Sequence, residues 1–161
     1  MAHGRGVGAE HPLNDPVQGL FFVLYLGVWG LDSFVFRFST VLADLVPLFI
    51  RLLLGLLSFV VGAYLATRSE AAVFGKDVGE RNLVTTGVYA FVRHPMYLGF
   101  LLILLGFFLA SLSLLSLVVW AGLFVFLDRM ATYEERDLCR ILGEQYLDYQ
   151  KQVPKWLPHV S

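Results

Sequence analysis

Residues 45–67 read LVPLFIRLLLGLLSFVVGAYLAT, a nearly unbroken apolar run. A helix needs about 20 apolar residues to cross about 30 Å of hydrocarbon, so this stretch predicts a membrane-spanning helix. Pro47 is tolerated in a first helical turn, and Arg51 is expected to extend its charged end to the membrane surface. This run therefore predicts a membrane protein built from helices.

A similar run precedes it, VQGLFFVLYLGVWGLDSFVF at residues 17–36, which contains one acid, Asp32. Residues 1–16 lack the basic region, short apolar core and cleavage site typical of a signal peptide, so we expect this first span to stay in the mature protein. Composition agrees with two or more spans. Hydrophobic residues make up 57% of the 161 residues and charged residues only 16%, which is more apolar surface than a small soluble core can bury.

On the C-terminal side, the 34 residues between Arg93 and Asp128 carry no formal charge when histidine is neutral. This run is too long for one ordinary span and short for two. The serines of LASLSLLS at 109–116 favour a turn, so we predict a helical hairpin over 97–127 with arms of about 15 residues, each about 22 Å long. A single long, tilted helix is the alternative. Small residues that are expected to let helix backbones approach closely are Gly99, Gly106, Ala110 and Gly122.

The pattern changes after the hairpin, where apolar side chains recur at steps of three and four residues between charged ones. This repeat predicts an amphipathic helix at the membrane surface or against the bundle, followed by Trp156 as an interfacial anchor. The residues of the repeat are Leu138, Ile141, Leu142, Gln145 or Tyr146, and Tyr149. The predicted fold is an all-α, polytopic membrane helix bundle with two spans in residues 1–67, a short helical hairpin and a C-terminal amphipathic helix, forming a single domain over 1–161.

Charge predicts the orientation of this bundle. All of the twelve Lys and Arg residues except Arg37 and Arg51 lie in the N-terminal, 68–93 and C-terminal segments, which the predicted topology places on one side. By the positive-inside rule, both termini and this end of the bundle face the cytosol. The lone Cys139 agrees with a reducing compartment. The net charge of −1 gives no sign of a nucleic-acid partner, and the scattered histidines predict no metal site.

Ionisable residues at the entrance of the uncharged run predict a functional site, because such groups are costly near hydrocarbon. Arg93 and His94 stand directly before the run, and Glu134 and Glu135 follow it by one to two helical turns. Since a hairpin brings its two ends together, we expect the acidic pair to lie near Arg93 and His94 and to form a cradle for a polar, cation-bearing ligand. The alternative is an Arg-His pair that only extends to the membrane surface.

Two sequence blocks carry a family resemblance. NLVTTGVYAFVRHPMYLGF at 82–100 and EERDLCRILGEQYLDYQKQVPKWLP at 134–158 together resemble the isoprenylcysteine carboxyl methyltransferase family, whose pattern is L-V-T-x-G-x-Y, R-H-P-x-Y-x-G and E-E-x-x-L-x-x-x-F-G-x-x-Y-x-x-Y-x-x-x-V-P. The resemblance covers about half of the chain, residues 81–158. It implies an integral membrane enzyme that holds S-adenosyl-L-methionine at the cytosolic end of its helices and takes a lipophilic substrate from the bilayer.

The resemblance also implies which residues contact the cofactor, with Glu135 added as a neighbouring carboxylate: Arg81, Asn82, Leu83, Val84, Tyr89, His94, Pro95, Met96, Tyr97, Glu134 and Glu135. In the family, an arginine associated with the substrate stands four residues before the first glutamate. That position is Met130 here, so we expect Arg129 beside it, or Arg93, to face the acceptor.

The expected acceptor is the carboxylate of a prenylcysteine-like compound, either a small lipophile or a prenylated protein. Such a carboxylate is ionised at neutral pH and needs no general base. Two alternatives remain. One is N- or S-methylation of another lipid or small lipophile, and the other is a membrane protein without enzymatic activity.

Overall fold

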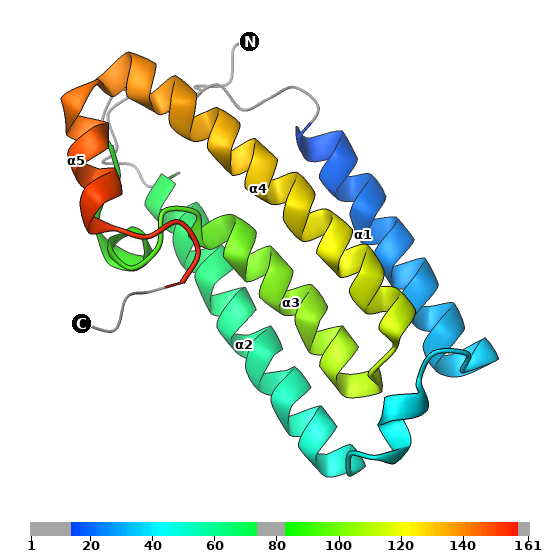
Figure 1. The fold of residues 1–161 in the computed structure, drawn as a ribbon. Helices are drawn as coiled ribbons and strands as arrows, with labels where there is room; N and C mark the ends of the chain where they lie inside the picture. Colours follow the sequence, from blue (N-terminus) through cyan, green and yellow to red (C-terminus); the bar gives the residue numbers. More distant parts are fainter. Residues whose placement is uncertain (1–13, 74–82, 158–161) are drawn as a thin grey trace.

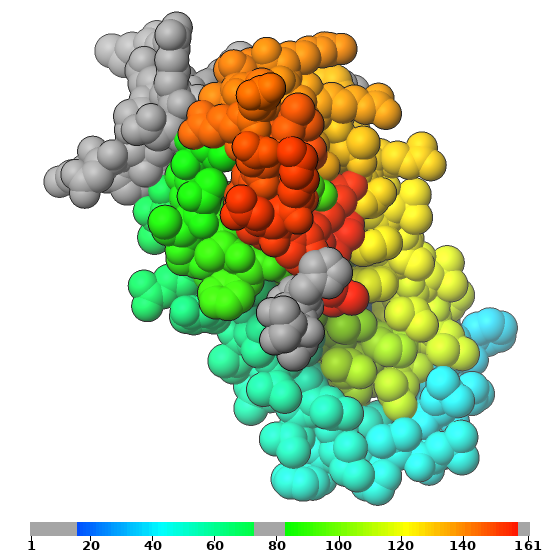
Figure 2. All heavy atoms as spheres, turned by 60° about the vertical axis from the view of Figure 1, so that its left-hand side comes forward, coloured from blue at the N-terminus to red at the C-terminus, as the bar shows by residue number. Residues whose placement is uncertain are grey.

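The computed structural model describes residues 14–73 and 83–157, and within these two ranges no residue lies in a β-strand. The helices are α1 (Asn14–Gly30), α2 (Leu48–Val73), α3 (Pro95–Ser111), α4 (Leu114–Leu142) and α5 (Glu144–Gln152), with short helical turns η1 (Leu31–Phe36), η2 (Val41–Asp44) and η3 (Gly87–Ala90). The four long helices run alternately up and down (Figure 1). One end of the bundle therefore holds the start of α1, the end of α2, the start of α3 and the end of α4. Helix α5 also lies at this end, beside the end of α4 (Figure 2).

Three helical segments are long and apolar enough to cross a membrane, Pro16–Phe36, Leu48–Ala72 and Leu114–Leu142. Two of these segments are the helices that the sequence predicts as N-terminal spans, and α2 begins directly after Pro47. Only 11% of the most apolar window of α2 is buried inside the protein, so lipid has to cover most of its surface. The chain is thus an all-helical membrane protein, as composition predicts.

The hairpin turn lies where the serines indicate, at Leu112 and Ser113 between α3 and α4, and the single long helix is excluded. The prediction of two equal arms is wrong. Helix α3 has 17 residues, but α4 has 29 and continues well past Asp128. The change from apolar to charged residues at Asp128 marks a change of surroundings and not a helix end, because the helical repeat continues without a proline.

The predicted single C-terminal amphipathic helix is also corrected. Its first half belongs to α4, which ends at Gly143, and its second half is α5. Gly143 has a φ of 59°, a left-handed value that favours glycine, so this one residue stops α4 and turns the chain into α5. Tyr146 and Tyr149 of α5 are buried and pack with Val153 against the end of α4.

Helices α2 and α3 pack more closely than any other pair. The contacts are reciprocal, because a Cβ at Gly62 would lie 2.6 Å from the carbonyl oxygen of Gly99, and one at Gly99 would lie 2.7 Å from that of Gly62. Gly55 and Gly106 form an equivalent pair further along. Gly99 and Gly106 thus allow close approach as predicted, but their partner is α2 and not the other arm of the hairpin. Ala110 touches α2 at the Gly55 pair, whereas a Cβ at Gly122 would meet only Phe21, at 3.7 Å.

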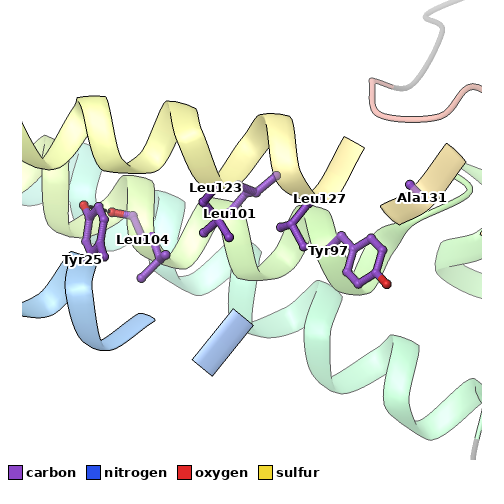
Figure 3. Packing of buried hydrophobic residues seen from close by; sticks show 7 residues of the cluster. All are labelled: Tyr25, Tyr97, Leu101, Leu104, Leu123, Leu127 and Ala131. Atoms are coloured by element: carbon purple, nitrogen blue, oxygen red, sulfur yellow. Dashed lines mark hydrogen bonds between the residues drawn. The ribbon is translucent and has the colours of Figure 1, made fainter. Parts of the chain in front are cut away.

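The buried core lies between α1, α3 and α4 (Figure 3). Its members are Tyr25, Tyr97, Leu101, Leu104, Leu123, Leu127 and Ala131. The Tyr25 hydroxyl donates a hydrogen bond of 2.6 Å to the carbonyl of Leu104, which satisfies the one polar atom of that ring. Because these core residues extend as far as Tyr97 and Ala131, the core packs directly against the polar residues at the end of the bundle.

Polar residues at the opposite end of the bundle join helix ends and loops. Asp32 is 2% exposed and accepts hydrogen bonds from the Ser39 amide at 2.9 Å and from the Ser39 and Ser113 hydroxyls, each at 2.5 Å. Arg51, whose charged end the sequence predicts to extend to the membrane surface, is bound to backbone carbonyls at this end of the bundle. Its guanidinium donates to the carbonyl oxygens of Val46 at 3.1 Å and Ala110 at 3.2 Å, because the last carbonyls of a helix such as α3 lack partners within the helix.

Candidate active site

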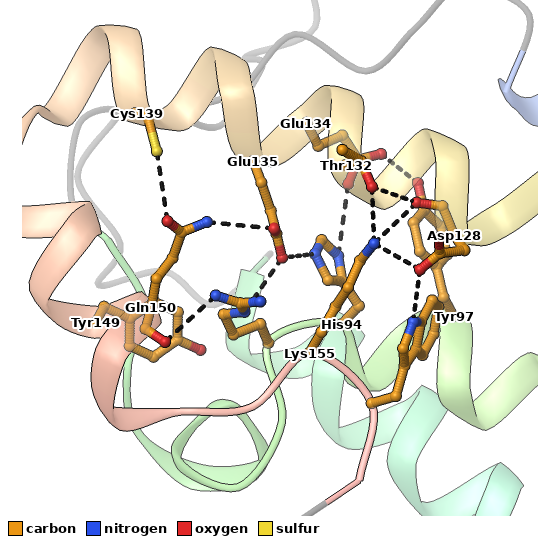
Figure 4. Close-up of polar contacts among 12 residues, drawn as sticks. His94, Tyr97, Asp128, Thr132, Glu134, Glu135, Cys139, Tyr149, Gln150 and Lys155 are labelled. Carbon is orange, nitrogen blue, oxygen red and sulfur yellow. Dashed lines mark hydrogen bonds and ion pairs between the residues drawn. The ribbon is translucent and has the colours of Figure 1, made fainter.

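The start of α3 sets the position of the central histidine. Pro95 is the first residue of α3, where its fixed φ and missing N–H suit the first helical turn. A proline disfavours helical geometry in the residue before it, and His94 accordingly has a φ of −123° and a ψ of 61°. The chain therefore changes direction at His94, and the imidazole reaches the acidic pair on α4 (Figure 4).

His94 contacts both members of the acidic pair. Its Nε2 lies 3.0 Å from Oε1 of Glu135, and its Nδ1 lies 3.7 Å from Oε2 of Glu134. The ring is stacked on Tyr97, with a centroid distance of 5.7 Å, and also packs against Trp156 at 6.1 Å. The predicted meeting of the two ends of the hairpin is confirmed. With a side chain only 8% exposed, His94 is not the surface-directed residue of the alternative interpretation.

Arg93 compensates the charge of Glu135. Its Nε lies 3.1 Å from Oε1 of Glu135, an ion pair without the alignment of a hydrogen bond, and its side chain is 13% exposed. Gln150 of α5 donates to Oε2 of Glu135 at 3.2 Å. The Arg93 amide donates to the carbonyl of Pro154 at 3.0 Å, so the same residue also fixes the chain after α5. Glu135 thus joins three separate segments.

Glu134 faces the tyrosines. The Tyr97 hydroxyl donates a hydrogen bond to Oε1 of Glu134. Burial, together with the nearby charge of Glu134, raises the pKa of Tyr89 to about 12. Burial and the neighbouring Tyr89 likewise raise the pKa of Tyr149 to about 12, and the Tyr149 hydroxyl donates to the Tyr89 carbonyl at 2.7 Å. The Tyr89 and Tyr149 phenols therefore stay protonated at neutral pH, and Tyr149 uses its one proton in the bond to the Tyr89 carbonyl.

The structure contains a second cluster of polar residues, around Asp128, that the sequence does not predict. Lys155 donates to Oδ1 of Asp128 at 2.6 Å and to the Thr132 hydroxyl at 2.8 Å, and the Trp156 indole donates to the same Asp128 oxygen at 2.9 Å. These contacts hold residues 153–157 against α4, and we call these residues the C-terminal segment. The prediction of Trp156 as an interfacial anchor is wrong, because its ring packs on His94 and its N–H is bonded inside the protein. The one sign of this cluster in the sequence is Asp128 itself, an isolated acid that ends the uncharged run.

The remaining residues that the resemblance implies surround this centre. Pro95 is buried, Val84 is half-buried, and Leu83 packs against the tyrosines of α5. Met96 is 36% exposed, although it follows two buried residues.

One predicted residue, Arg129, does not join the centre. Arg81 and Asn82 lie outside the described residues. Arg129 is exposed on α4, five residues before Glu134, so its side chain leaves the helix about 140° around the axis from that of Glu134. The role of Arg129 toward an acceptor stays a prediction.

A groove opens beside Glu135, between α4 and α5. Its volume is about 330 Å³, and it is lined by Thr132, Glu135, Arg136, Cys139, Arg140 and Gln150. Small-molecule sites begin at roughly 300 Å³, so the groove is large enough for a small ligand or for part of a larger one. The sequence gives no sign of the groove, because four of these residues lie at unspecified positions between the family's motif residues. Within the part of the chain that the structure describes, no three His, Cys, Asp or Glu side chains are placed to hold a metal ion.

Comparison with known families matches this chain to one described as phospholipid methyltransferase, over residues 50–145. Among curated proteins, the protein-S-isoprenylcysteine O-methyltransferase of Schizosaccharomyces pombe is 43% identical over 82 residues, which cover 47% of this chain and 33% of that protein. The mouse protein of the same name is 39% identical over 80 residues, or 49% of this chain and 28% of its own. A methanethiol S-methyltransferase of Crocosphaera subtropica is 34% identical over 78 residues, or 48% of this chain and 29% of its own. The matched part spans a third or less of each of these relatives.

Comparison with solved structures matches the fold to a eukaryotic intramembrane Ras methyltransferase, an isoprenylcysteine carboxyl methyltransferase. The TM-score is 0.67 at 23% identity, and the match covers 91% of this chain and 54% of the other. Almost the whole chain thus follows the helical arrangement of just over half of that protein.

Proposed function

Because the chain belongs to the phospholipid methyltransferase family, we propose that it transfers a methyl group from S-adenosyl-L-methionine to a lipophilic acceptor in the membrane. The observation that carries this proposal is the placement of His94 against both Glu134 and Glu135 at one end of the bundle. Buried ionisable groups that contact one another at the end of a membrane bundle are typical of a ligand site. The names of the curated relatives favour the carboxylate of a prenylcysteine-like compound as the acceptor.

The described residues fit this cofactor by the chemistry of their side chains. Glu134 and Glu135 can accept hydrogen bonds from an ammonium or from ribose hydroxyls, and the rings of Tyr97 and Trp156 suit a cation or an adenine. When bound, S-adenosyl-L-methionine supplies the methyl group from a sulfonium, which is already an active electrophile. The residues of this chain then have to bind and orient the cofactor and the acceptor, and to keep water away from both.

Orientation is the main task if the acceptor is a carboxylate, because that nucleophile is already ionised at neutral pH. His94 and Arg93 are nearly buried, and Tyr97 and Trp156 pack on the histidine ring, so the centre is rigid and largely closed to water. A rigid, dry centre strengthens every charge contact that forms within it.

A second candidate function is transfer to a thiol, which the similarity to a methanethiol S-methyltransferase favours. A thiol has to lose a proton before it attacks. His94 is the candidate base for that proton, because its ring nitrogens lie at the same end of the bundle as Glu134 and Glu135 and contact both carboxylates. The two candidates therefore differ in whether His94 carries a proton during the reaction.

Transfer of labelled methyl groups separates the candidates. The purified protein is supplied with labelled S-adenosyl-L-methionine and with a farnesylated cysteine, a lipid amine or a small thiol. Label on the farnesylated cysteine alone supports the first candidate, and label on the thiol alone supports the second. Absence of label on all three compounds, with a protein that is folded, contradicts the proposed function.

Cofactor binding provides an independent prediction. Glu134→Gln and His94→Ala are each expected to weaken S-adenosyl-L-methionine binding by about 1.5–3 kcal/mol, the usual scale for a lost hydrogen bond to a charged group. Calorimetry on the purified protein in detergent measures the change. Glu144→Gln, on an exposed residue of α5, is the control and should bind as the wild type does. Unchanged affinity in both site variants would show that these residues do not hold the cofactor.

We also propose that the chain is one domain whose termini and active-site end face the cytosol. Of the basic residues that the structure describes, all except Arg37 and Arg51 lie in segments that adjoin this end, which the helix ends share (Figure 1). Single cysteines at Gly4 or Ser161, in a Cys139→Ser background, should be protected from an impermeant thiol reagent in intact cells and react after lysis. Labelling of either cysteine in intact cells would contradict the proposed orientation.

A further inference from the structure

Two arginines in the α4/α5 groove pair with no carboxylate of the residues that the structure describes. Arg136 and Arg140 lie one turn apart on α4, both line the groove and both are exposed. Among residues 14–73 and 83–157, neither forms an ion pair with an acid. Like charges at this spacing destabilise a helix, so the arrangement has a cost that a bound anion would remove.

The carboxylate in the same wall does not neutralise them. Glu135 is already engaged by Arg93 at 3.1 Å, by His94 at 3.0 Å and by the amide of Gln150 at 3.2 Å. Its negative charge is therefore compensated on the side that faces the buried centre. The groove keeps the positive charges of Arg136 and Arg140, whose planar guanidinium groups match the two oxygens of a carboxylate.

We propose that the α4/α5 groove is a carboxylate-binding site in which Arg136 and Arg140 hold one of the two ligands of the reaction. This inference rests on the proposed function, because it assigns the carboxylate to the methyl acceptor or to the amino-acid part of the cofactor. The groove shares Glu135 with the His94 centre, so a carboxylate held there lies beside the buried centre. Arg129 lies on the same face as Arg136 but about 10 Å nearer the membrane, and it does not line the groove.

The chain carries its own probe for this site. Cys139 lies in the wall of the groove, and it is the one cysteine among the 161 residues. Its rate of reaction with an anionic disulfide, dithiobis-nitrobenzoate, is compared with its rate toward the neutral methyl methanethiosulfonate. Both reagents consume the thiolate, so the ratio of rates cancels changes in thiol ionisation and reports how strongly the groove attracts an anion.

In this assay, Arg136→Gln and Arg140→Gln are each expected to lower the ratio of anionic to neutral rates at least about threefold at low salt, and high salt should remove the difference. Arg68→Gln, an exposed arginine on α2, is the matched control and should leave the ratio unchanged. A ratio that is the same in all three variants and the wild type overturns the proposal, whether or not the protein is a methyltransferase.

Ligand protection identifies the source of the carboxylate. If the site holds the cofactor, S-adenosylhomocysteine slows the reaction of Cys139, and Arg136→Gln weakens its binding about tenfold. If the site holds the acceptor, N-acetyl-S-farnesylcysteine gives the protection, its methyl ester does not, and Arg136→Gln weakens binding of the acid only.

Protection by neither compound, when calorimetry shows that both bind to the wild type, overturns the proposal. Failure of the wild type to bind either compound counts against the proposed function, and the ratio of rates then decides the anion site alone.

Discussion

Glu135→Ala is expected to abolish methyl transfer and to lower the stability of the protein. The substitution leaves Arg93 and His94, with side chains 13% and 8% exposed, without the carboxylate that both contact. Removing one partner from a nearly buried ion pair costs about 3–5 kcal/mol, because the other charge stays in a poorly solvated place. Gln150 loses its acceptor as well, so the contact between α4 and α5 weakens. Thermal unfolding in detergent and label transfer to the farnesylated cysteine measure the two effects.

Two comparisons separate the charge from the hydrogen bonds. Glu135→Gln keeps an acceptor oxygen and removes the charge, so its stability should lie between the wild type and Glu135→Ala. Glu144→Ala, on an exposed residue of α5, should leave unfolding and activity unchanged. Activity is measured at a temperature at which every variant is folded. A Glu135→Ala protein with normal unfolding and normal turnover would contradict the central role of this carboxylate.

Gly62→Ala is expected to separate α2 from α3 and to destabilise the bundle by about 3 kcal/mol, the upper part of the usual range for overpacking. The new methyl group would lie 2.6 Å from the Gly99 carbonyl oxygen and 2.8 Å from the Ile103 amide nitrogen. Both atoms belong to the backbone of α3, so no flexible side chain can move aside. Since His94 directly precedes α3, a shift of α3 also displaces the active site.

The matched control is Gly27→Ala in α1, where an added Cβ meets nothing within 4 Å. Alanine is the better helix former by about 0.5–1 kcal/mol, so this variant should unfold at the same temperature as the wild type or slightly above it. Equal unfolding midpoints for Gly62→Ala and Gly27→Ala would show that the close contact between α2 and α3 contributes little to stability.

The sequence predicted those parts of the fold that the bilayer determines. A span requires a long apolar run, and such runs located the first two helices to within a few residues at most ends. The serine-rich turn was also found, because polar hydroxyls are rare within an uncharged run and Ser113 caps α4. The meeting of His94 with Glu134 and Glu135 follows from the hairpin topology alone.

The parts of the fold that depend on packing could not be predicted from the sequence. Nothing local shows that Gly99 faces Gly62 on α2 instead of the other arm of the hairpin, because glycine has no side chain to indicate a direction. The sequence does not predict the length of α4, because the change of polarity at Asp128 suggests a helix end, whereas the true stop is Gly143 with its left-handed φ of 59°. A glycine after a long helical repeat was the available signal.

Within the site, the contacts made by the C-terminal segment were the least predictable. Lys155 and Trp156 are the partners of Asp128, yet the chain between them forms the rest of α4 and all of α5. A lysine and a tryptophan near a membrane surface are ordinary anchors when they are considered alone, and only the turn at Gly143 brings them back to α4. The groove arginines were missed for a related reason, because exposed arginines on a helix have no distinguishing pattern until α5 closes one side.

The contacts of Asp128 have a consequence for the order of biosynthesis. Its partners Lys155 and Trp156 come 27 and 28 residues later in the chain. A ribosome adds about 5–20 residues per second, so roughly one to five seconds pass between the synthesis of Asp128 and that of its partners. Until residue 155 is made Asp128 lacks its cation, and until residue 150 is made Glu135 lacks Gln150, although α1, α2 and α3 are already complete. Insertion of the helices and completion of the centre are therefore separate events, and the second waits for the ribosome to reach residue 156.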